Sequence, residues 1–126
     1  IMGDIDGFKR VNDQFGHECG DFVLSSLSNL FLSLLRKQDI VGRWGGEEFI
    51  LLLPELNQEQ AVTFTQNLKK SIANHSFRDV SQITVSCGVT IFNKGDTKKS
   101  LLKRTDTALY RAKNRGRNKV ISYDEN

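Results

Sequence analysis

The sequence predicts an α/β domain built on one mixed β-sheet that is backed by helices. Short runs of apolar and β-branched residues alternate with amphipathic segments, in the order strand, helix, hairpin, helix, strand, helix, strand. Each amphipathic segment needs a sheet face to cover its apolar stripe, which favours a single layered sheet. A length of 126 residues, with 38% hydrophobic and 26% charged residues, is typical of one globular domain.

The first half of the chain contains a strand, a helix and a hairpin. Residues 1–5 form the end of a hydrophobic strand, and residues 21–36 form a helix whose apolar side chains recur at spacings of three and four. This stripe consists of Val23, Leu27, Leu30 and Leu34. Two apolar runs, 40–44 and 49–53, bracket a pair of glycines, so we expect a β-hairpin with the glycines in its turn.

The second half contains two helices and two strands. Residues 57–74 begin with an asparagine followed three residues later by glutamine, which is a capping-box pattern, and continue as a helix. Residues 83–92 are rich in β-branched side chains and form a buried strand. A third helix runs from about Leu101 and stops before Gly116, and residues 120–123 form a last short strand.

Composition argues against several classes of protein. No apolar run reaches the roughly 20 residues needed to cross a bilayer, and no signal peptide opens the sequence. Cys19 and Cys87 lack the spacing of a zinc site or a disulfide framework, so reduced thiols and a cytoplasmic location are expected. Because the sequence starts inside a hydrophobic strand, we expect the native protein to continue upstream into a sensor or membrane segment.

Four carboxylates predict a metal site. Asp4 and Asp6 lie where the first strand ends, and Glu47 and Glu48 follow the glycine pair of the hairpin. Solvated acids in a turn would explain the aspartates alone, but adjacent glutamates beside glycines oppose stability and favour a bound cation. A hard cation such as Mg²⁺ takes a few carboxylates and leaves positions for phosphate oxygens. This interpretation requires the hairpin to pack beside the first strand.

Cationic and amide groups elsewhere predict a phosphate-bearing ligand. The net charge of +3 is densest in the C-terminal third, where Lys113 and Arg117 supply positive charge near the end of the third helix. Phe8 and Lys9 follow Gly7 and offer backbone amides. A solvated helix face would explain any one of these cations, and together with the carboxylates they indicate a nucleotide site.

Three segments of the sequence carry long motifs: DIDGFKRVNDQFGHECGD at residues 4–21, RWGGEEF at residues 43–49 and TDTALYRAKNRGRN at residues 105–118. Together they resemble the GGDEF family, the catalytic domain of diguanylate cyclases. Residues 4–21 are similar to its DxDxFKxxND…GHxxGD signature. Residues 43–49, RWGGEEF, resemble its RxGGDEF segment with glutamate as the third residue, and residues 105–118, TDTALYRAKNRGRN, resemble its closing ADxALYxAKxxGRN pattern. The resemblance implies a ferredoxin-like palm, an α+β fold like that of nucleotidyl cyclases with a mixed central sheet. It also implies condensation of two GTP into cyclic di-GMP and two pyrophosphates across a homodimer.

The family motifs imply a role for each matching residue. Asp4, Glu47 and Glu48 are the implied catalytic carboxylates, and with the Ile5 carbonyl they would bind two divalent cations, Mg²⁺ or Mn²⁺, per active site. The implied substrate ligands are Asn12 and Asp21 for guanine, backbone groups of Phe8 and Lys9 for the triphosphate, and Lys113 and Arg117 for its β and γ phosphates. A carboxylate at position 21 accepts from both N1–H and the exocyclic amine of guanine, whereas adenine presents a bare acceptor. Such a site rejects the wrong base by roughly 10⁴-fold.

Residues 36–39, RKQD, resemble the RxxD site at which family members are inhibited by their own product. The resemblance implies that Arg36 and Asp39 bind cyclic di-GMP. The alternative is an arginine placed favourably at a helix C-terminus. Some relatives have a second arginine on the following helix, whereas this chain has Asn67, which weakens the expectation of tight feedback.

Two other functions are compatible with the sequence. One is a catalytically silent receptor for GTP or cyclic di-GMP, against which the complete set of motif residues argues. The other is a ferredoxin-like nucleic-acid-binding module, which the positive charge permits. Such modules display aromatic side chains on the sheet, and no RNP-like run is present, so no nucleic-acid partner is expected.

Overall fold

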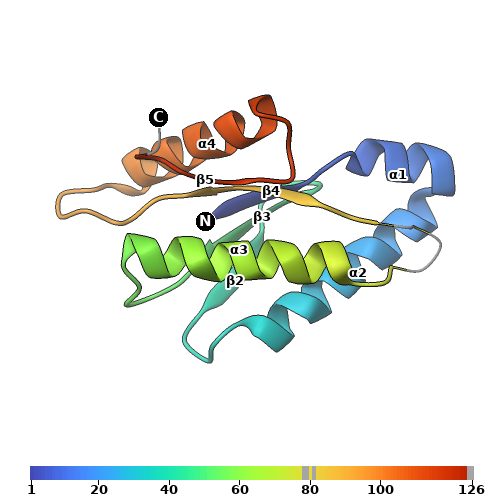
Figure 1. The fold of residues 1–126 in the computed structure, drawn as a ribbon, viewed down its shortest axis with the longest axis horizontal. Coiled ribbons are helices and arrows are strands. Elements are labelled where there is room, and N and C mark those ends of the chain that lie inside the picture. The colour runs from blue at the N-terminus through green and yellow to red at the C-terminus, as the bar shows by residue number, and fades with distance from the viewer. Residues whose placement is uncertain (78–79, 81, 125–126) are drawn as a thin grey trace.

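The computed structural model describes residues 1–77, 80 and 82–124, which form one sheet and four helices (Figure 1). The elements are β1 Met2–Ile5, α1 Phe8–Phe15, α2 His17–Leu34, β2 Ile40–Arg43, β3 Glu48–Leu52, α3 Gln58–Asn74, β4 Val85–Val89, α4 Lys98–Asn114 and β5 Val120–Ser122. Within these described residues no helix combines the length and the apolar character needed to cross a membrane.

The five strands form a mixed sheet in the order β2-β3-β1-β4-β5. The central β1 is antiparallel to both β3 and β4, β2 is antiparallel to β3, and β5 is parallel to β4. The first four strands, with helices after β1 and after β3, form the βαββαβ unit of a ferredoxin-like fold. The ferredoxin-like palm expected from the motifs is therefore confirmed, with β5 added at the edge beside β4 and α4 added on one face.

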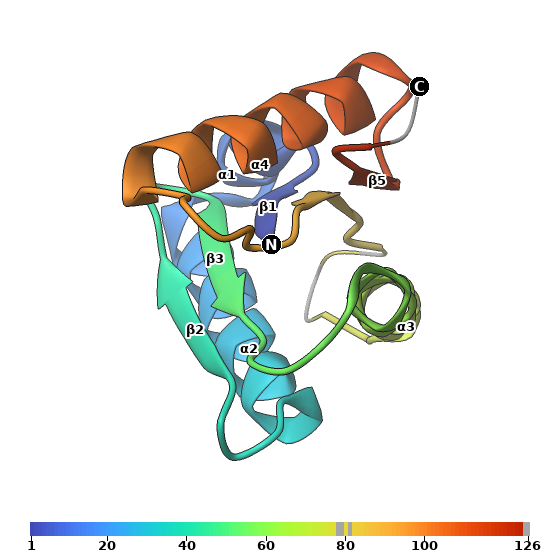
Figure 2. The ribbon, with the colours of Figure 1, turned by 90° about the vertical axis from the view of Figure 1, so that its left-hand side faces the viewer.

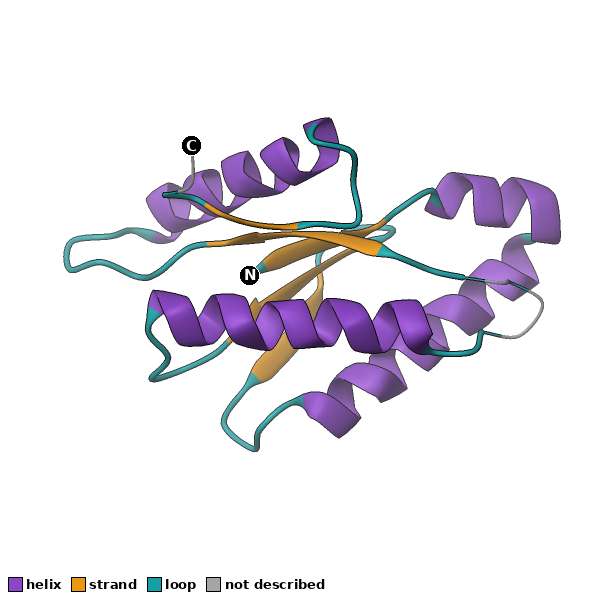
Figure 3. Cartoon of the chain, viewed as in Figure 1, coloured by secondary structure: helices purple, strands orange, loops and turns teal. Residues whose placement is uncertain are grey.

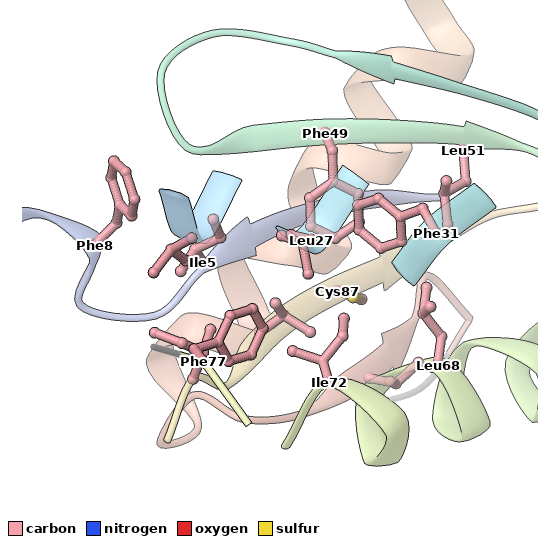
Figure 4. Close-up of a cluster of buried hydrophobic side chains, with 14 of the residues drawn as sticks. Ile5, Phe8, Leu27, Phe31, Phe49, Leu51, Leu68, Ile72, Phe77 and Cys87 are labelled. Carbon is pink, nitrogen blue, oxygen red and sulfur yellow. The ribbon is translucent and has the colours of Figure 1, made fainter. Parts of the chain in front are cut away.

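Helices cover both faces of the sheet (Figure 2). α2 and α3 lie on one face, and α4 lies on the other face over β1, β4 and β5. The main core fills the layer between the sheet and α2 and α3, where the rings of Phe31 and Phe49 lie 4.6 Å apart (Figure 4). A Cβ atom on Gly3 would lie 2.1 Å from the Phe49 ring, so glycine at this position leaves room for the ring of its β3 partner to lie over β1.

Several predicted elements are confirmed with their signals (Figure 3). The hairpin forms from β2 and β3 as expected. Asn57 accepts a hydrogen bond from the Gln60 N–H at 2.8 Å, and the Gln60 side chain accepts from the Asn57 N–H at 3.0 Å, which completes the capping box of α3. These elements are the ones whose start or turn depends on a short, local motif.

Other helices and strands begin or end at residues that differ from those predicted by apolar spacing. α1 is absent from the sequence prediction, although Phe8, Val11 and Phe15 recur in it at spacings of three and four; it is only eight residues long and buries Phe8 and Val11. α2 begins at His17, four residues before the expected start, and β4 is shorter than residues 83–92. α4 begins at Lys98 because Thr97 and Ser100 form a capping box that the apolar stripe does not reveal.

Candidate active site

The carboxyl end of β1 lies directly beside the hairpin. Asp4 is the Cα partner of Glu48, and the Ile5 N–H donates to the Glu47 carbonyl oxygen at 3.2 Å. Directly opposed residues on neighbouring antiparallel strands point to the same face of a sheet. The register therefore brings the acidic groups of the strand end and of the hairpin together, as a shared cation site requires.

Asp4 is buried, and its two carboxylate oxygens have different surroundings. Oδ2 forms an ion pair with the ammonium group of Lys113 from α4. Oδ1 has no hydrogen-bond partner among the described residues. A buried acceptor without a partner is costly, and a bound cation would supply one. The surroundings of Asp4 therefore fit a metal ligand.

The electrostatics of Glu47 also favour a cation. Burial raises the pKa of the Glu47 carboxyl, the negative charge of Asp4 raises it further, and Lys113 opposes the shift. The negative charge of Glu48 also raises the pKa of Glu47. A cation bound between these carboxylates would favour the ionised form and reverse the shift.

The side chains do not by themselves build a closed metal cluster. In the part of the chain that the structure describes, no three or more His, Cys, Asp and Glu side chains gather closely enough to hold an ion. The available side-chain donors at the strand end are Asp4, Glu47 and Glu48. Mg²⁺ is usually held by one or two carboxylates, with water and substrate phosphates completing its octahedron, so an incomplete set of protein ligands suits this ion.

The turn that carries the glutamates is held by its own backbone and by Arg43. The Trp44 N–H donates to the Glu48 carbonyl oxygen at 2.8 Å. The Arg43 guanidinium donates to the Gly46 carbonyl oxygen at 3.0 Å from Nε and at 2.7 Å from Nη2. Gly45 has a φ of 113°, which a residue with a side chain rarely adopts. These contacts hold the conformation of the turn that carries Glu47 and Glu48.

The N-terminus of α1 follows β1 immediately, and its first backbone N–H groups have no hydrogen-bond partner in the described part of the chain. Gly7 forms the N-cap with a left-handed φ of 66° and provides no side-chain cap. The first N–H groups of a helix have no partner within the helix, and the Val11 N–H is the first here to bond back, to the Gly7 carbonyl oxygen. The amides of Phe8 and Lys9 therefore lie at a helix N-terminus, where phosphate groups commonly bind.

A groove of about 420 Å³ separates α2 from the hairpin. Its polar lining comes from Asp21, Ser25 and Ser28 on α2 and from Arg43, Glu47 and Glu48 on the hairpin, while Leu27, Phe31 and Phe49 form apolar parts of its wall. The groove therefore joins the carboxylate expected to bind guanine to the carboxylates expected to bind metal. Its combination of apolar walls and a few polar groups is typical of small-molecule sites.

Asn12 lies beside this groove and against the start of α2. It is not among the lining residues of the groove. A Cβ atom added to Gly20 would lie 1.8 Å from Asn12 Oδ1, so the Asn12 amide occupies the space that a side chain at position 20 would take. This contact places Asn12 next to the residue that precedes Asp21.

The basic groups predicted to bind phosphate lie at the C-terminal end of α4. Lys113 is in the last turn of the helix, where it contacts Asp4. Arg117 follows in the next turn, with 55% of its side chain exposed and its guanidinium 4.0 Å from the Asp6 carboxylate. The structure thus brings both cations to the end of β1 that carries the aspartates.

Comparison with known protein families identifies the family of this fold. The family described as diguanylate cyclase, GGDEF domain, matches residues 1–119. The chain belongs to the GGDEF domain family. The three motifs, the strand end and the hairpin that form the candidate site all lie inside the matched range.

Known relatives share the GGDEF domain over almost all of this chain. It is 44% identical over 122 residues to diguanylate cyclase DgcM of Escherichia coli K12, covering 97% of this chain and 30% of DgcM. It superimposes on the active GGEEF domain of a diguanylate cyclase from Vibrio cholerae with a TM-score of 0.91 and 38% identity, over 99% of this chain and 81% of that chain. The GGDEF domain of DgcB from Caulobacter crescentus, solved in complex with c-di-GMP, gives a TM-score of 0.91 at 29% identity, over 98% and 76%.

The RxxD residues of this GGDEF domain pair with each other. The Arg36 guanidinium donates to both Asp39 carboxylate oxygens, at 2.7 Å from Nη2 and 3.1 Å from Nε, and also to the Pro54 carbonyl oxygen at 2.7 Å. These hydrogen bonds lower the pKa of the Asp39 carboxyl. Arg36 also borders a hollow of about 370 Å³ whose other walls include Phe64 and Asn67. The motif therefore closes the loop between α2 and β2 and faces a concave surface.

Sequence reasoning missed the partners of Asp6 and the role of Gly20. Asp6 is not a solvated acid, because hydroxyl groups of Thr84 and Ser86 donate to its carboxylate at 2.8 and 2.6 Å. Two hydroxyl residues alternating within the strand region of 83–92 are the signal that could have indicated a polar contact there. No periodicity indicates that Gly20 leaves room for Asn12, since that contact joins two separate helices.

Proposed function

We propose that this GGDEF domain is the catalytic half-site of a diguanylate cyclase, which condenses two GTP into cyclic di-GMP and two pyrophosphates. The observation that carries the proposal is the register of β1 and β3, which sets Asp4 beside Glu48 and Glu47 with Lys113 next to them. Since the chain spans 30% of DgcM, the activity of the whole protein, including any upstream regulatory segment, belongs to this proposal.

Asp4, Glu47 and the Ile5 carbonyl would hold the divalent cations, with Glu48 at the second ion or orienting the first ligands. The unpaired Oδ1 of Asp4 and the raised pKa of Glu47 support this assignment. Two ions, Mg²⁺ or Mn²⁺, would lower the pKa of a ribose 3′-hydroxyl and neutralise charge on the triphosphate. Lys113, which contacts Asp4 in this structure, would then pair with the phosphates instead.

The rest of the nucleotide follows the groove and the two helix ends. Asp21 and Asn12 would bind guanine, and the free amides of Phe8 and Lys9 at the start of α1 would bind the triphosphate. Lys113 and Arg117 would hold the β and γ phosphates. This order agrees with the groove, which connects Asp21 to Glu47 and Glu48.

One domain binds one GTP, so the reaction needs two domains facing each other. Each 3′-hydroxyl attacks the α-phosphorus of the opposing nucleotide; an O–P bond forms, the bond to pyrophosphate breaks and the hydroxyl proton is released. Two such steps close the ring. In-line attack requires the reacting atoms to approach to about 3–3.5 Å, which only a homodimer of the domains provides.

Arg36 and Asp39 form the proposed inhibitory site for the product. The hollow beside Arg36 supports this role, because guanidinium groups bind phosphate and guanine edges through their planar fork. The pairing with Asp39 and Pro54 shows that Arg36 is already oriented within the loop. Asn67 borders the same hollow and offers a neutral amide where a second arginine would add charge.

Incubation of the protein with GTP and Mg²⁺, followed by mass analysis of the nucleotides, tests the proposal. The expected products are cyclic di-GMP and pyrophosphate in a ratio of one to two, with none from ATP and none from the Glu47→Gln variant. Bound but unchanged GTP at high protein concentration would instead identify a silent receptor.

A further inference from the structure

Asp6 connects the end of β1 to the turn that carries Arg117. We propose that Asp6 is a positioning residue, which acts through Arg117 to set the affinity of the site for the β and γ phosphates of the nucleotide. This inference rests on the proposed function, because it requires a triphosphate at the end of α4. It assigns to the second aspartate of the strand end a role different from that of Asp4.

Both oxygens of the Asp6 carboxylate accept hydrogen bonds from the protein. Oδ1 accepts from the Ser86 hydroxyl at 2.6 Å, and Oδ2 accepts from the Thr84 hydroxyl at 2.8 Å and from the Asn118 N–H at 2.9 Å. The Asp6 N–H also donates to the Thr84 carbonyl oxygen at 2.9 Å. Asp4, by contrast, keeps one buried oxygen that no described residue contacts through a hydrogen bond. Asp6 therefore anchors a turn, whereas Asp4 is left able to bind a cation.

The turn that Asp6 anchors has an unusual backbone. Gly116, Arg117 and Asn118 have φ values of 106°, 64° and 48°, all in the left-handed region. Residues with a side chain enter this region at a cost, and they persist there only where surrounding contacts hold them. Here the Asn118 N–H bonds to Asp6, and the Arg117 N–H bonds to the Ala112 carbonyl oxygen at 3.0 Å. Without Asp6 one of these two contacts is lost.

The same contacts orient the Arg117 side chain but leave its guanidinium without a close hydrogen bond to Asp6. Its guanidinium lies 4.0 Å from Asp6 Oδ1, within the attraction of the carboxylate but beyond a close hydrogen bond. More than half of the side chain is exposed, so it remains accessible to a ligand. Because Asp4 contacts Lys113 and Asp6 contacts the Arg117 turn, one strand aligns both phosphate-binding cations with the carboxylates of the metal site.

Binding of two nucleotides to Asp6→Ala in the presence of Mg²⁺ tests this role. The probes are 3′-deoxy-GTP, which lacks the attacking hydroxyl and cannot react, and GMP, which lacks the β and γ phosphates. We expect the variant to bind 3′-deoxy-GTP roughly tenfold more weakly than the wild type, as for loss of a charged hydrogen bond, and GMP within twofold. A general loosening of the domain would weaken both nucleotides equally and would overturn the proposal.

A double-mutant cycle shows whether Asp6 acts through Arg117. In an Arg117→Ala background, Asp6→Ala should change the affinity for 3′-deoxy-GTP by less than twofold; a full tenfold loss there would refute the coupling. Asp6→Asn retains an acceptor for the Asn118 N–H and should give a smaller loss, which keeps the test decisive if the alanine variant does not fold.

A matched control and the wild type separate the possible failures. Asp96→Ala removes another well-bonded aspartate, the partner of Arg104 at the opposite end of α4, and should leave both affinities unchanged. If the wild-type protein binds neither nucleotide, the proposed function fails. If the wild type binds both and Asp6→Ala matches it, the role of Asp6 alone is wrong.

Discussion

Substitution of Gly20 by alanine separates the stability of the fold from recognition of the base. The added Cβ atom would lie 1.8 Å from Asn12 Oδ1, 2.9 Å from Asn12 Cγ and 3.3 Å from Phe8 Cζ. Real Cβ contacts are not shorter than 3.0 Å, so the Asn12 amide must move by more than an ångström. The nearest atoms belong to the end of one side chain, so a rotation of Asn12 relieves the clash without displacing α1 or α2.

The substitution then changes two measurable quantities, the stability of the fold and the affinity for GTP, through different free-energy terms. Alanine in place of glycine inside a helix stabilises it by about 0.8–1.0 kcal/mol, which offsets the strain of moving Asn12. The displaced amide would lose the hydrogen bond to guanine that we propose for it, which would contribute about 1 kcal/mol, or roughly a fivefold loss of affinity. We therefore expect Gly20→Ala to melt within a few degrees of the wild type and to bind GTP about fivefold more weakly.

Calorimetric titration with 3′-deoxy-GTP and thermal unfolding measure the two quantities on the same samples. Ser33→Ala, an exposed position on α2, controls for helix propensity and should leave nucleotide affinity unchanged. In an Asn12→Ala background the effect of Gly20→Ala on affinity should vanish. Unchanged affinity for Gly20→Ala in the wild-type background would refute the assignment of Asn12 to the base.

Three further substitutions address the metal, the base and the product. Glu47→Gln should abolish turnover, because several kcal/mol of metal-derived charge stabilisation is lost; assays of cyclic di-GMP formation check this, and near-native turnover would contradict it. The pKa of Glu47 is raised in the folded protein above the ordinary glutamate pKa of 4.5. The metal-free wild type should therefore lose stability as the pH rises from 4.5 through this raised pKa. Metal-free Glu47→Gln should therefore melt higher than the wild type at neutral pH and equally well below pH 4.5. Asp21→Ala should narrow the preference for GTP over ATP by about tenfold in competition binding, and an unchanged ratio would move base recognition elsewhere. Arg36→Ala should relieve inhibition by added cyclic di-GMP without changing GTP affinity. Equal inhibition of the wild type and the variant would show that the RxxD motif only stabilises the loop.

Local signals in the sequence predicted much of the fold. The apolar spacing of α2, the capping box of α3 and the glycine pair of the hairpin each act within a few residues, and all three elements are present. The missed helix, α1, also has a local signal, because Phe8, Val11 and Phe15 recur at spacings of three and four. The segment spans only eight residues, and the sequence prediction did not use this signal; in the structure α1 packs against α2.

Part of the candidate site could be predicted from the sequence, and part of it depends on how the strands are arranged. The motifs placed carboxylates at a strand end and a hairpin, and the β1–β3 register shows that these two segments meet. The residue pattern alone did not separate Asp4 from Asp6, and the family motifs gave a role only to Asp4. Among the described residues Asp4 keeps one oxygen without a partner, whereas Asp6 accepts hydrogen bonds from Thr84, Ser86 and Asn118. The difference arises from the strand order, which places β4 beside β1, and strand order is not written in the spacing of residues along the chain.

The dependence of initial rate on protein concentration tests the central proposal, that two GTP-bearing domains must face each other. Each domain supplies one nucleotide, so a monomer should bind GTP and leave it unconverted. The account predicts that specific activity rises with protein concentration as sedimentation shows dimer forming. Fusion to a parallel coiled coil should restore activity at low concentration when the linker lets the sites face each other. Specific activity that stays constant over a wide concentration range, while sedimentation shows only monomer, would contradict the two-domain mechanism.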